Sequence, residues 1–247
     1  MKIIIFLVFA NLFGQGYNMQ LLGQLSFEQN TSDITGFYQD GREFAVIGLQ
    51  NAAAFVDVTD PSNPFEVGRI SGGNSTWRDL KYWNRHVYIG TEASDGVKVV
   101  SVDNLDNPQL VYTITDFTNN HNINIDDDGY LYVVGASQNA IWIYDLSQPS
   151  NPVLVGTWGS GGQDDYIHDL TVYNNTIYGA SIYSGYIYII DVTNKSNPQT
   201  LTSFDTGGGY ISSHDTAVTP DEKYLFTGDE NTGGHVKIWD ISNYNNI

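Results

Sequence analysis

The sequence predicts an all-β fold assembled from repeated four-stranded antiparallel units. One phrase recurs along the chain, as FVDVTDPSNP, VSVDNLDNP, IYDLSQPSNP and IIDVTNKSNP. The four copies end at Pro64, Pro108, Pro152 and Pro198, which lie 44, 44 and 46 residues apart. No run within the repeats shows helical periodicity. Four-stranded units of about 40–50 residues without helices are typical of the blades of a β-propeller, which surround a central channel.

The elements of one unit can be followed along residues 168–204. Runs rich in Val, Ile, Tyr and Thr are separated by Asn-Asn, Ser-Gly and Ser-Asn-Pro, which favour turns. We expect strands at 170–173, 176–180, 186–192 and 199–204, paired in sequence order as a meander. The third strand is apolar on both faces, as a strand packed between two neighbouring sheets should be.

The recurrent phrase follows the third strand and leads into the fourth. Asp191 and Thr193 offer side-chain oxygens to free backbone N–H groups of the turn. Pro198 fixes φ and lacks an N–H group, which a sheet tolerates at the first residue of an outer strand. We therefore interpret the phrase as a structural element without chemistry of its own.

About five blades are expected, with repeats at about 17–71, 72–115, 116–160, 161–206 and 207–247. Their first strands begin at Ser32, Trp77, His121, His168 and His214.

The stretch MQLLGQLSF, residues 19–27, resembles a fourth strand that no first, second or third strand precedes. Two alternatives follow: the last blade is incomplete, or this N-terminal strand completes its sheet and hides two edges.

The first sixteen residues, MKIIIFLVFANLFGQG, have the pattern of a secretory signal. One Lys precedes an apolar run from Ile3 to Phe13, and Gly14 and Gly16 offer small residues near a cleavage point. Such a run is too short to span a bilayer, and the lack of polar alternation disfavours a first core strand. We expect a signal peptide at 1–16, a β-propeller domain at 17–247, and a secreted or cell-surface location. No other segment has the sequence of a transmembrane span.

Charge and cysteine content exclude several classes of function. The chain has 28 acidic and 10 basic residues, which gives a net charge of −18. This field repels nucleic acids and anionic membrane surfaces, so no nucleic-acid partner is expected. The sequence contains no cysteine, which excludes disulfides and thiolate metal sites.

A polar pair recurs where each first strand begins. The pairs are Ser32-Asp33, Arg78-Asp79, His121-Asn122, His168-Asp169 and His214-Asp215. Because the first strand of a propeller blade is innermost, these residues should lie at the channel mouth. The loops between second and third strands, which contain Glu92, Asp229 and Glu230, should lie beside them.

We therefore expect a ligand-binding face that collects polar groups from all blades. Its candidate residues are Arg78, Asp79, Glu92, His121, Asn122, His168, Asp169, His214, Asp215, Asp229 and Glu230. The alternative is structural, because a repeated polar pair can also satisfy buried backbone groups between adjacent sheets.

The sequence does not identify a cofactor. A divalent metal is one candidate. His121, His168 and His214 are candidate neutral-imidazole ligands, and imidazole with carboxylate suits Zn, Fe, Cu or Mn. A spacing of about one blade between the ligands differs from compact signatures such as HExxH.

The repeats resemble the LVIVD-repeat proteins of bacterial surfaces, and in particular the choice-of-anchor B family. Residues 75–102, 121–135 and 214–241 carry the resemblance, together with the Asp-Val-Thr/Ser…Asn-Pro phrases. The resemblance implies a secreted propeller that is tethered by a C-terminal anchor, with further blades and that anchor after Ile247. It implies no defined biochemical activity.

Three functions are consistent with these observations, one of which is a purely architectural role as an adhesin or spacer with no ligand at that face. The favoured one is a non-enzymatic binding module that holds a protein, glycan or small molecule at the channel mouth. The alternative is a metal-dependent enzyme that uses the ring of His121, His168 and His214.

Overall fold

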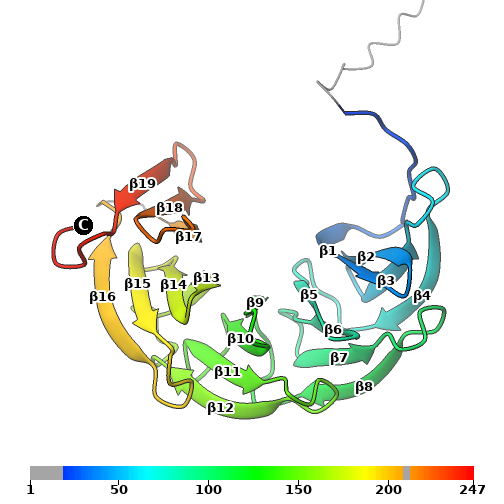
Figure 1. Ribbon diagram of the computed structural model, residues 1–247, viewed down its shortest axis with the longest axis horizontal. Helices are drawn as coiled ribbons and strands as arrows, with labels where there is room; N and C mark the ends of the chain where they lie inside the picture. Colours follow the sequence, from blue (N-terminus) through cyan, green and yellow to red (C-terminus); the bar gives the residue numbers. More distant parts are fainter. Residues whose placement is uncertain (1–18, 208–211) are drawn as a thin grey trace, which may run out of the picture.

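The computed structural model describes residues 19–207 and 212–247, so the predicted signal at 1–16 lies outside the described residues. The described residues form strands and no helices, in five antiparallel sheets that follow one another around an open arc (Figure 1). The all-β prediction and the prediction of about five blades are confirmed. Within the described part of the chain, no helix offers the length and apolarity that a membrane span requires.

Each sheet pairs its strands in sequence order and forms one blade. The first two blades consist of β1 (Thr31–Gln39), β2 (Arg42–Leu49), β3 (Ala52–Asp57) and β4 (Phe65–Ser71), and of β5 (Leu80–Trp83), β6 (His86–Ile89), β7 (Val97–Ser101) and β8 (Gln109–Ile114). The next two consist of β9 (Asn122–Ile125), β10 (Tyr130–Val134), β11 (Ile141–Asp145) and β12 (Val153–Trp158), and of β13 (Ile167–Tyr173), β14 (Thr176–Ser181), β15 (Tyr186–Asp191) and β16 (Gln199–Asp205). The fifth consists of β17 (Ser213–Val218), β18 (Tyr224–Asp229) and β19 (Val236–Asp240).

The four strands expected between residues 170 and 204 correspond to β13, β14, β15 and β16. The main difference is that β13 begins at Ile167, three residues earlier than expected, so it includes His168 and Asp169. The third strands of the first three blades, β3, β7 and β11, are almost wholly buried as predicted. In the fourth blade β15 is partly buried, and in the fifth β19 is mostly exposed, which departs from the prediction.

The recurrent phrase forms the expected turn. Thr193 N donates a hydrogen bond to Asp191 Oδ1 at 2.8 Å, and Thr59 N donates to Asp57 Oδ1 at the same distance. Pro198 directly precedes β16. Each copy therefore closes its turn with a local side-chain acceptor, which explains the repeated Asp without any chemistry.

The hydrophobic core is divided into layers between neighbouring blades. In one layer Tyr88 and Val99 of the second blade pack with Leu131, Val133 and Tyr144 of the third. Equivalent layers join the first blade to the second, the third to the fourth, and the fourth to the fifth. Burial of apolar side chains on both faces of the sheets therefore holds the arc together.

The prediction of an outer strand at residues 19–27 is wrong, because this segment forms no strand in the structure. The fifth sheet has three strands in the described residues, and it lies at the opposite end of the arc from the first (Figure 1). Phe27 instead packs on the first blade against Leu49, Ala52 and Ala54. The segment covers the apolar face nearest to it, since the last sheet is too distant to pair with it.

Candidate functional site

The residues that begin the innermost strands are displaced by β-bulges. Ile167 pairs with Ser181 and Asp169 with Ala180, so His168 is the extra residue between them. In the last blade Ser213 pairs with Asp229 and Asp215 with Gly228, which leaves His214 as the extra residue. A bulge breaks the alternation of a strand and redirects a side chain. The side chains of His168 and His214 therefore do not follow the regular alternation of side chains between the two faces of a strand.

Three histidines from three successive blades stack in one row, which we call the histidine column. The ring centroids of His121 and His168 are 4.0 Å apart, and those of His168 and His214 are 4.3 Å apart. The planes are tilted by 47° and 42°. The indole of Trp77 stands edge-on to His121, with centroids 6.2 Å apart. Residues more than 40 positions apart in sequence thus meet at one point of the structure.

The central ring of the column is held neutral. His168 is buried, and its Nδ1 donates a hydrogen bond to the carbonyl oxygen of His214 at 3.3 Å. Burial, with a smaller effect from His121 and His214, lowers the pKa of His168 to about 3. Because Nδ1 carries the proton, Nε2 of the neutral ring is a hydrogen-bond acceptor.

The first ring of the column is positioned by two neighbours. His121 Nδ1 donates to Glu92 Oε1 at 2.7 Å, and Glu92 comes from the loop that follows β6 in the second blade. Gly135 has a φ of 67°, and a Cβ atom built on it would lie 2.3 Å from the Cβ of His121. The close approach of backbone to ring therefore requires glycine at this position.

A cavity of about 390 Å³ lies on one side of the column, and we call it the rim cavity. The three histidines line it together with Trp77, Tyr166 and Tyr183. Glu92 and Glu230 contribute carboxylates. Trp77 is 50% exposed and Tyr183 is 64% exposed, so these rings are accessible from solvent. The volume is in the range of small-molecule pockets.

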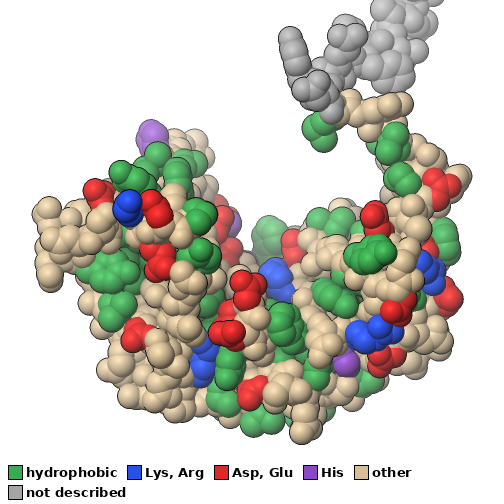
Figure 2. Space-filling view, viewed as in Figure 1, with side chains coloured by type: hydrophobic (Ala, Val, Ile, Leu, Met, Phe, Trp, Pro, Cys, Tyr) green, Lys and Arg blue, Asp and Glu red, His purple; other side chains and the backbone are tan. Residues whose placement is uncertain are grey.

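A second cavity of about 560 Å³, the channel cavity, is lined by residues of the innermost strands of all five blades. It contains four of the repeated aspartates, with Lys81, Arg78 and Asn122 beside them. The aspartates are Asp33, Asp79, Asp169 and Asp215. Figure 2 shows acidic side chains facing the hollow on the concave side of the arc. Trp77 and His121 line both cavities, so the two spaces adjoin.

The first aspartates of this set bind the backbone of the next blade. Asp33 Oδ2 accepts a hydrogen bond from Leu80 N at 3.1 Å, and Asp79 Oδ2 accepts one from Ile123 N at 2.7 Å. Lys81 Nζ also donates to Asp79 at 2.5 Å. Burial raises the pKa of Asp79 to about 7 although Lys81 opposes the shift. These contacts match the structural alternative for the repeated pair.

The third blade carries Asn122 where the others have aspartate, and Asp169 has fewer contacts. Asp169 Oδ1 accepts a hydrogen bond from Leu170 N at 2.7 Å. Burial, followed by the nearby charge of Asp215, raises the pKa of Asp169 to about 7. Perturbed carboxylates in a cavity are typical of functional sites, although structural networks perturb them too.

Two of the predicted site residues have mainly structural contacts. Arg78 is buried, and its guanidinium donates to the carbonyl oxygens of Leu49, Gln50 and Gly73. Burial lowers its pKa. Asp229 pairs with Lys237 at 2.8 Å inside the last blade. Ten of the eleven candidates line one of the two cavities and Asp229 lines neither, while Arg78 and Asp229 chiefly support the fold.

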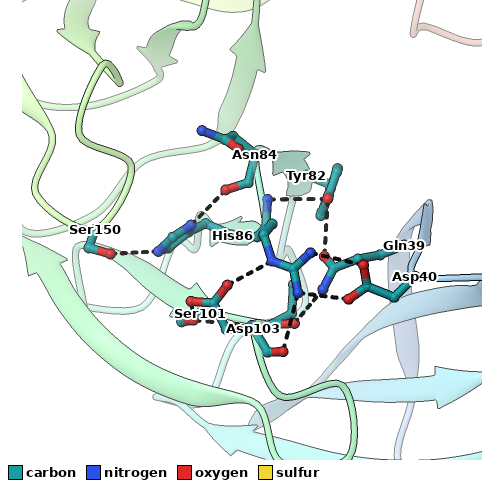
Figure 3. Close-up of polar contacts among 10 residues, drawn as sticks. Gln39, Asp40, Tyr82, Asn84, His86, Ser101, Asp103 and Ser150 are labelled. Atoms are coloured by element: carbon teal, nitrogen blue, oxygen red, sulfur yellow. Dashed lines mark hydrogen bonds and ion pairs between the residues drawn. The ribbon is translucent and has the colours of Figure 1, made fainter.

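A fourth histidine belongs to a separate network between blades (Figure 3). His86 Nδ1 bonds to Asn84 O at 2.9 Å, and its Nε2 bonds to Ser150 Oγ of the third blade at 2.6 Å. Next to it, Arg85 pairs with Asp40 of the first blade at 2.7 Å and with Asp103 at 2.7 Å. This network joins three blades on the side of the β1–β2 and β5–β6 turns, away from the histidine column.

Several residues of the two cavities were not among the sequence candidates, and Trp77, Tyr166 and Lys81 are three of them. Trp77 directly precedes the polar pair of its blade, and Tyr166 precedes His168 by two residues. Lys81 lies on β5, two residues after Asp79, which precedes that strand, and its Nζ donates to the Asp79 carboxylate. The nearness of Lys81 to Asp79 in sequence is the signal that predicts it, whereas only the edge-on contact with His121 identifies Trp77.

The three histidine rings are stacked on one another, with tilted planes. Among residues 19–207 and 212–247, no group of three His, Asp or Glu side chains is placed to hold a metal ion. Coordination of one ion requires nitrogen lone pairs that converge, while the rings of the column stack on one another at a tilt. The metal assignment and the binding roles of the other candidates stay predictions.

Comparisons with known proteins agree with this architecture. The family model of the LVIVD repeat matches residues 43–71, 122–159 and 166–206. No curated protein matches the chain. A structure described as a functionally unknown protein from Desulfotomaculum acetoxidans is similar over 90% of this chain and 74% of its own, with 15% identity and a TM-score of 0.66. The β-propeller domain of Cps50 (Swd1) from Myceliophteria thermophila is similar over 83% of this chain and 68% of its own, with 10% identity and a TM-score of 0.62.

Both structural similarities are low in sequence identity and therefore concern the fold alone. They agree with the repeats, the sheet order and the arc of blades derived above. The chain has a β-propeller fold, and three of its segments match the LVIVD repeat.

Proposed function

We propose that this chain is an exported interaction module that binds its ligand at the rim where the histidine column lies. The ligand is a protein, a glycan or a small molecule. The observation that carries the proposal is the column itself, which gathers rings from three blades between two adjoining cavities. Export rests on the signal-like sequence at 1–16 and on the resemblance to the choice-of-anchor B family of bacterial surfaces.

The five histidines of the chain provide a direct test by NMR of their ring ¹³Cε1–¹H signals. Three report on the proposed site, while His86 and His235 serve as internal controls, and single His→Gln variants assign the signals. A library of amine, carboxylate, sugar and aromatic fragments should contain members that shift the signals of His121, His168 and His214 only. If the library shifts only the control signals, or none, the site is wrongly assigned.

A variant series supports the same test. His168→Ala with His214→Ala should weaken binding of the library members found at the column at least tenfold. Because His168 is buried, its loss can disturb folding, so Tyr183→Ala provides a second variant at an exposed ring of the same cavity. Retention of full affinity in both folded variants would contradict the proposal.

A further inference from the structure

The lining of the rim cavity is unusually rich in rings. Trp77 stands edge-on to His121, and Tyr166 and Tyr183 pack together with centroids 5.0 Å apart. The three histidines of the column line the same cavity. Aromatic faces carry negative electrostatic potential, and they attract cations placed above them. The faces of Trp77 and Tyr183 are free to act in this way because both side chains are at least half exposed.

The charge of the cavity has one sign. Glu92 and Glu230 line it, and no Lys or Arg does so among the described residues. The central ring, His168, is buried, and its Nδ1 donates to the carbonyl oxygen of His214. An incoming group therefore finds carboxylates and ring faces, both of which attract a cationic hydrogen-bond donor.

We propose that the rim cavity binds an organic ammonium group. This inference rests on the proposed function and names the chemical class of its ligand. A volume of about 390 Å³ exceeds the need of a single inorganic cation and accommodates an amine with several carbons. The source is either a free amine or the lysine side chain of a partner protein. The net charge of −18 steers either of them toward the chain.

Other ligand classes fit the cavity less well. An anion would meet two carboxylates and no Lys or Arg among the described lining residues. A neutral polyol could stack on Trp77, but it would leave the carboxylates without a counter-charge. The ammonium satisfies both the ring faces and the carboxylates at once.

The test uses the full chain and pairs of probes in which a hydroxyl group or a hydrogen atom replaces the ammonium group. Pentane-1,5-diamine is compared with pentane-1,5-diol, and N-acetyl-lysine methylamide with N-acetyl-norleucine methylamide. Binding is followed by the ¹³Cε1–¹H signals of the histidines and by calorimetry. Each amine should bind at least tenfold more tightly than its neutral partner and shift the signals of the column. Tighter binding of the diamine indicates a free amine, and tighter binding of the lysine derivative indicates a protein side chain.

Matched variants locate the interaction. Glu92→Gln and Trp77→Leu should each weaken amine binding at least fivefold. Glu43→Gln and Tyr112→Leu change an exposed acid and an exposed ring elsewhere, and they should leave the affinity unchanged. The ammonium proposal is overturned if the diol binds as well as the diamine, if no amine shifts the column signals, or if Glu92→Gln binds normally. Shifts of the column signals by neutral or anionic fragments alone would refute this proposal and leave the binding module intact.

Discussion

At the scale of residues, one position at the start of each innermost strand serves two purposes. Ser32 Oγ donates to the carbonyl oxygen of Arg78 in the next blade, and His168 donates to that of His214 in the same way. Each of these contacts satisfies a backbone group between blades. In the third, fourth and fifth blades the same position is also aromatic, and only there does it form a column. The structural and the binding interpretations of the polar pair are therefore compatible.

The carboxyl group of Asp169 makes stability depend on pH. Its pKa is raised to about 7 in the folded chain, mainly by burial and then by Asp215, against about 4 in an unfolded chain. The folded state therefore favours the protonated form, and this contribution to stability is full below about pH 4 and is lost as the pH rises through 7. Asp169→Asn keeps a neutral group that can accept the hydrogen bond from Leu170 N.

We expect the free energy of unfolding of Asp169→Asn, relative to the parent, to increase by roughly 1–3 kcal/mol between pH 5 and pH 8.5. Urea unfolding at several pH values measures the difference. Asp221→Asn is the control, because hydrogen bonds from Thr219 and Lys223 lower the pKa of Asp221 and give no such increase. A difference that does not change with pH would show that Asp169 titrates normally.

At this scale the sequence predicts the equivalent positions of the three histidines, but not the bulges beside two of them. The repeat register placed His121, His168 and His214 in equivalent positions, and equivalent positions of neighbouring blades are adjacent. The bulges beside His168 and His214 were not predictable, because a bulge depends on how a strand pairs and leaves no pattern in these residues. The tilted stacking of the three rings is therefore visible only in the structure, and the metal hypothesis had no geometric test before it.

At the scale of elements, the fourth strands share a device that joins neighbouring blades. Each of β4, β8, β12 and β16 has a bulge opposite its third strand. In two of them a glycine at the bulge meets the turn of the next blade. A Cβ atom on Gly68 would lie 2.9 Å from Pro108, and one on Gly156 would lie 1.9 Å from the carbonyl oxygen of Lys195. The proline turn and the bulged strand are thus partners across blades.

Gly156→Ala should separate the third and fourth blades locally. Its added methyl group meets backbone atoms that cannot rotate away, so we expect a loss of about 2–3 kcal/mol in the free energy of unfolding. Gly228→Ala is the matched control, since it lies on β18 and a Cβ atom there meets nothing within 4 Å. Denaturant unfolding should show a lower midpoint for Gly156→Ala alone. Equal midpoints for the two variants would mean that the blades have room to move apart.

The strands themselves were largely predictable, because alternating and buried runs are bounded by Asn, Gly and Pro turns. Residues 19–27 were the exception. Their pattern is that of an outer strand, but a strand also needs a partner, and the fifth sheet lies at the far end of the arc (Figure 1). The distance between this segment and the fifth sheet prevents the strand pairing that its local sequence pattern predicts. The early start of β13 at Ile167 has the same origin, since pairing with Ser181 extends the strand.

At the scale of the whole molecule, the two ends of the arc are unlike each other. The first blade is covered by the segment that carries Phe27, whereas β19 pairs on one side only within the described residues. Val236 and Ile238 on this strand are 74% and 62% exposed. The pairing of β19 with β18 has no bulge, unlike that of the other outermost strands. A regular, exposed, apolar edge is a template for pairing with another chain.

Two opposing terms therefore govern self-association of this chain. A net charge of −18 repels copies from one another at low salt, and salt screens that repulsion with a Debye length of about 10 Å at 0.1 M. We expect the chain to be monomeric in dilute buffer and to self-associate in about 0.5 M NaCl through β19. Sedimentation velocity across a range of protein concentrations measures both states.

The double variant Val236→Lys with Ile238→Lys distinguishes the effect of the exposed β19 edge on association from the effect of net charge. It lowers the magnitude of the negative charge, which by itself would favour association, but it places two cations on the free edge, where they oppose strand pairing. We therefore expect it to stay monomeric in high salt. Leu110→Lys with Tyr112→Lys makes the same charge change on exposed residues of the bulged strand β8 and should associate like the parent. If both variants behave alike, net charge governs association and the edge of β19 does not.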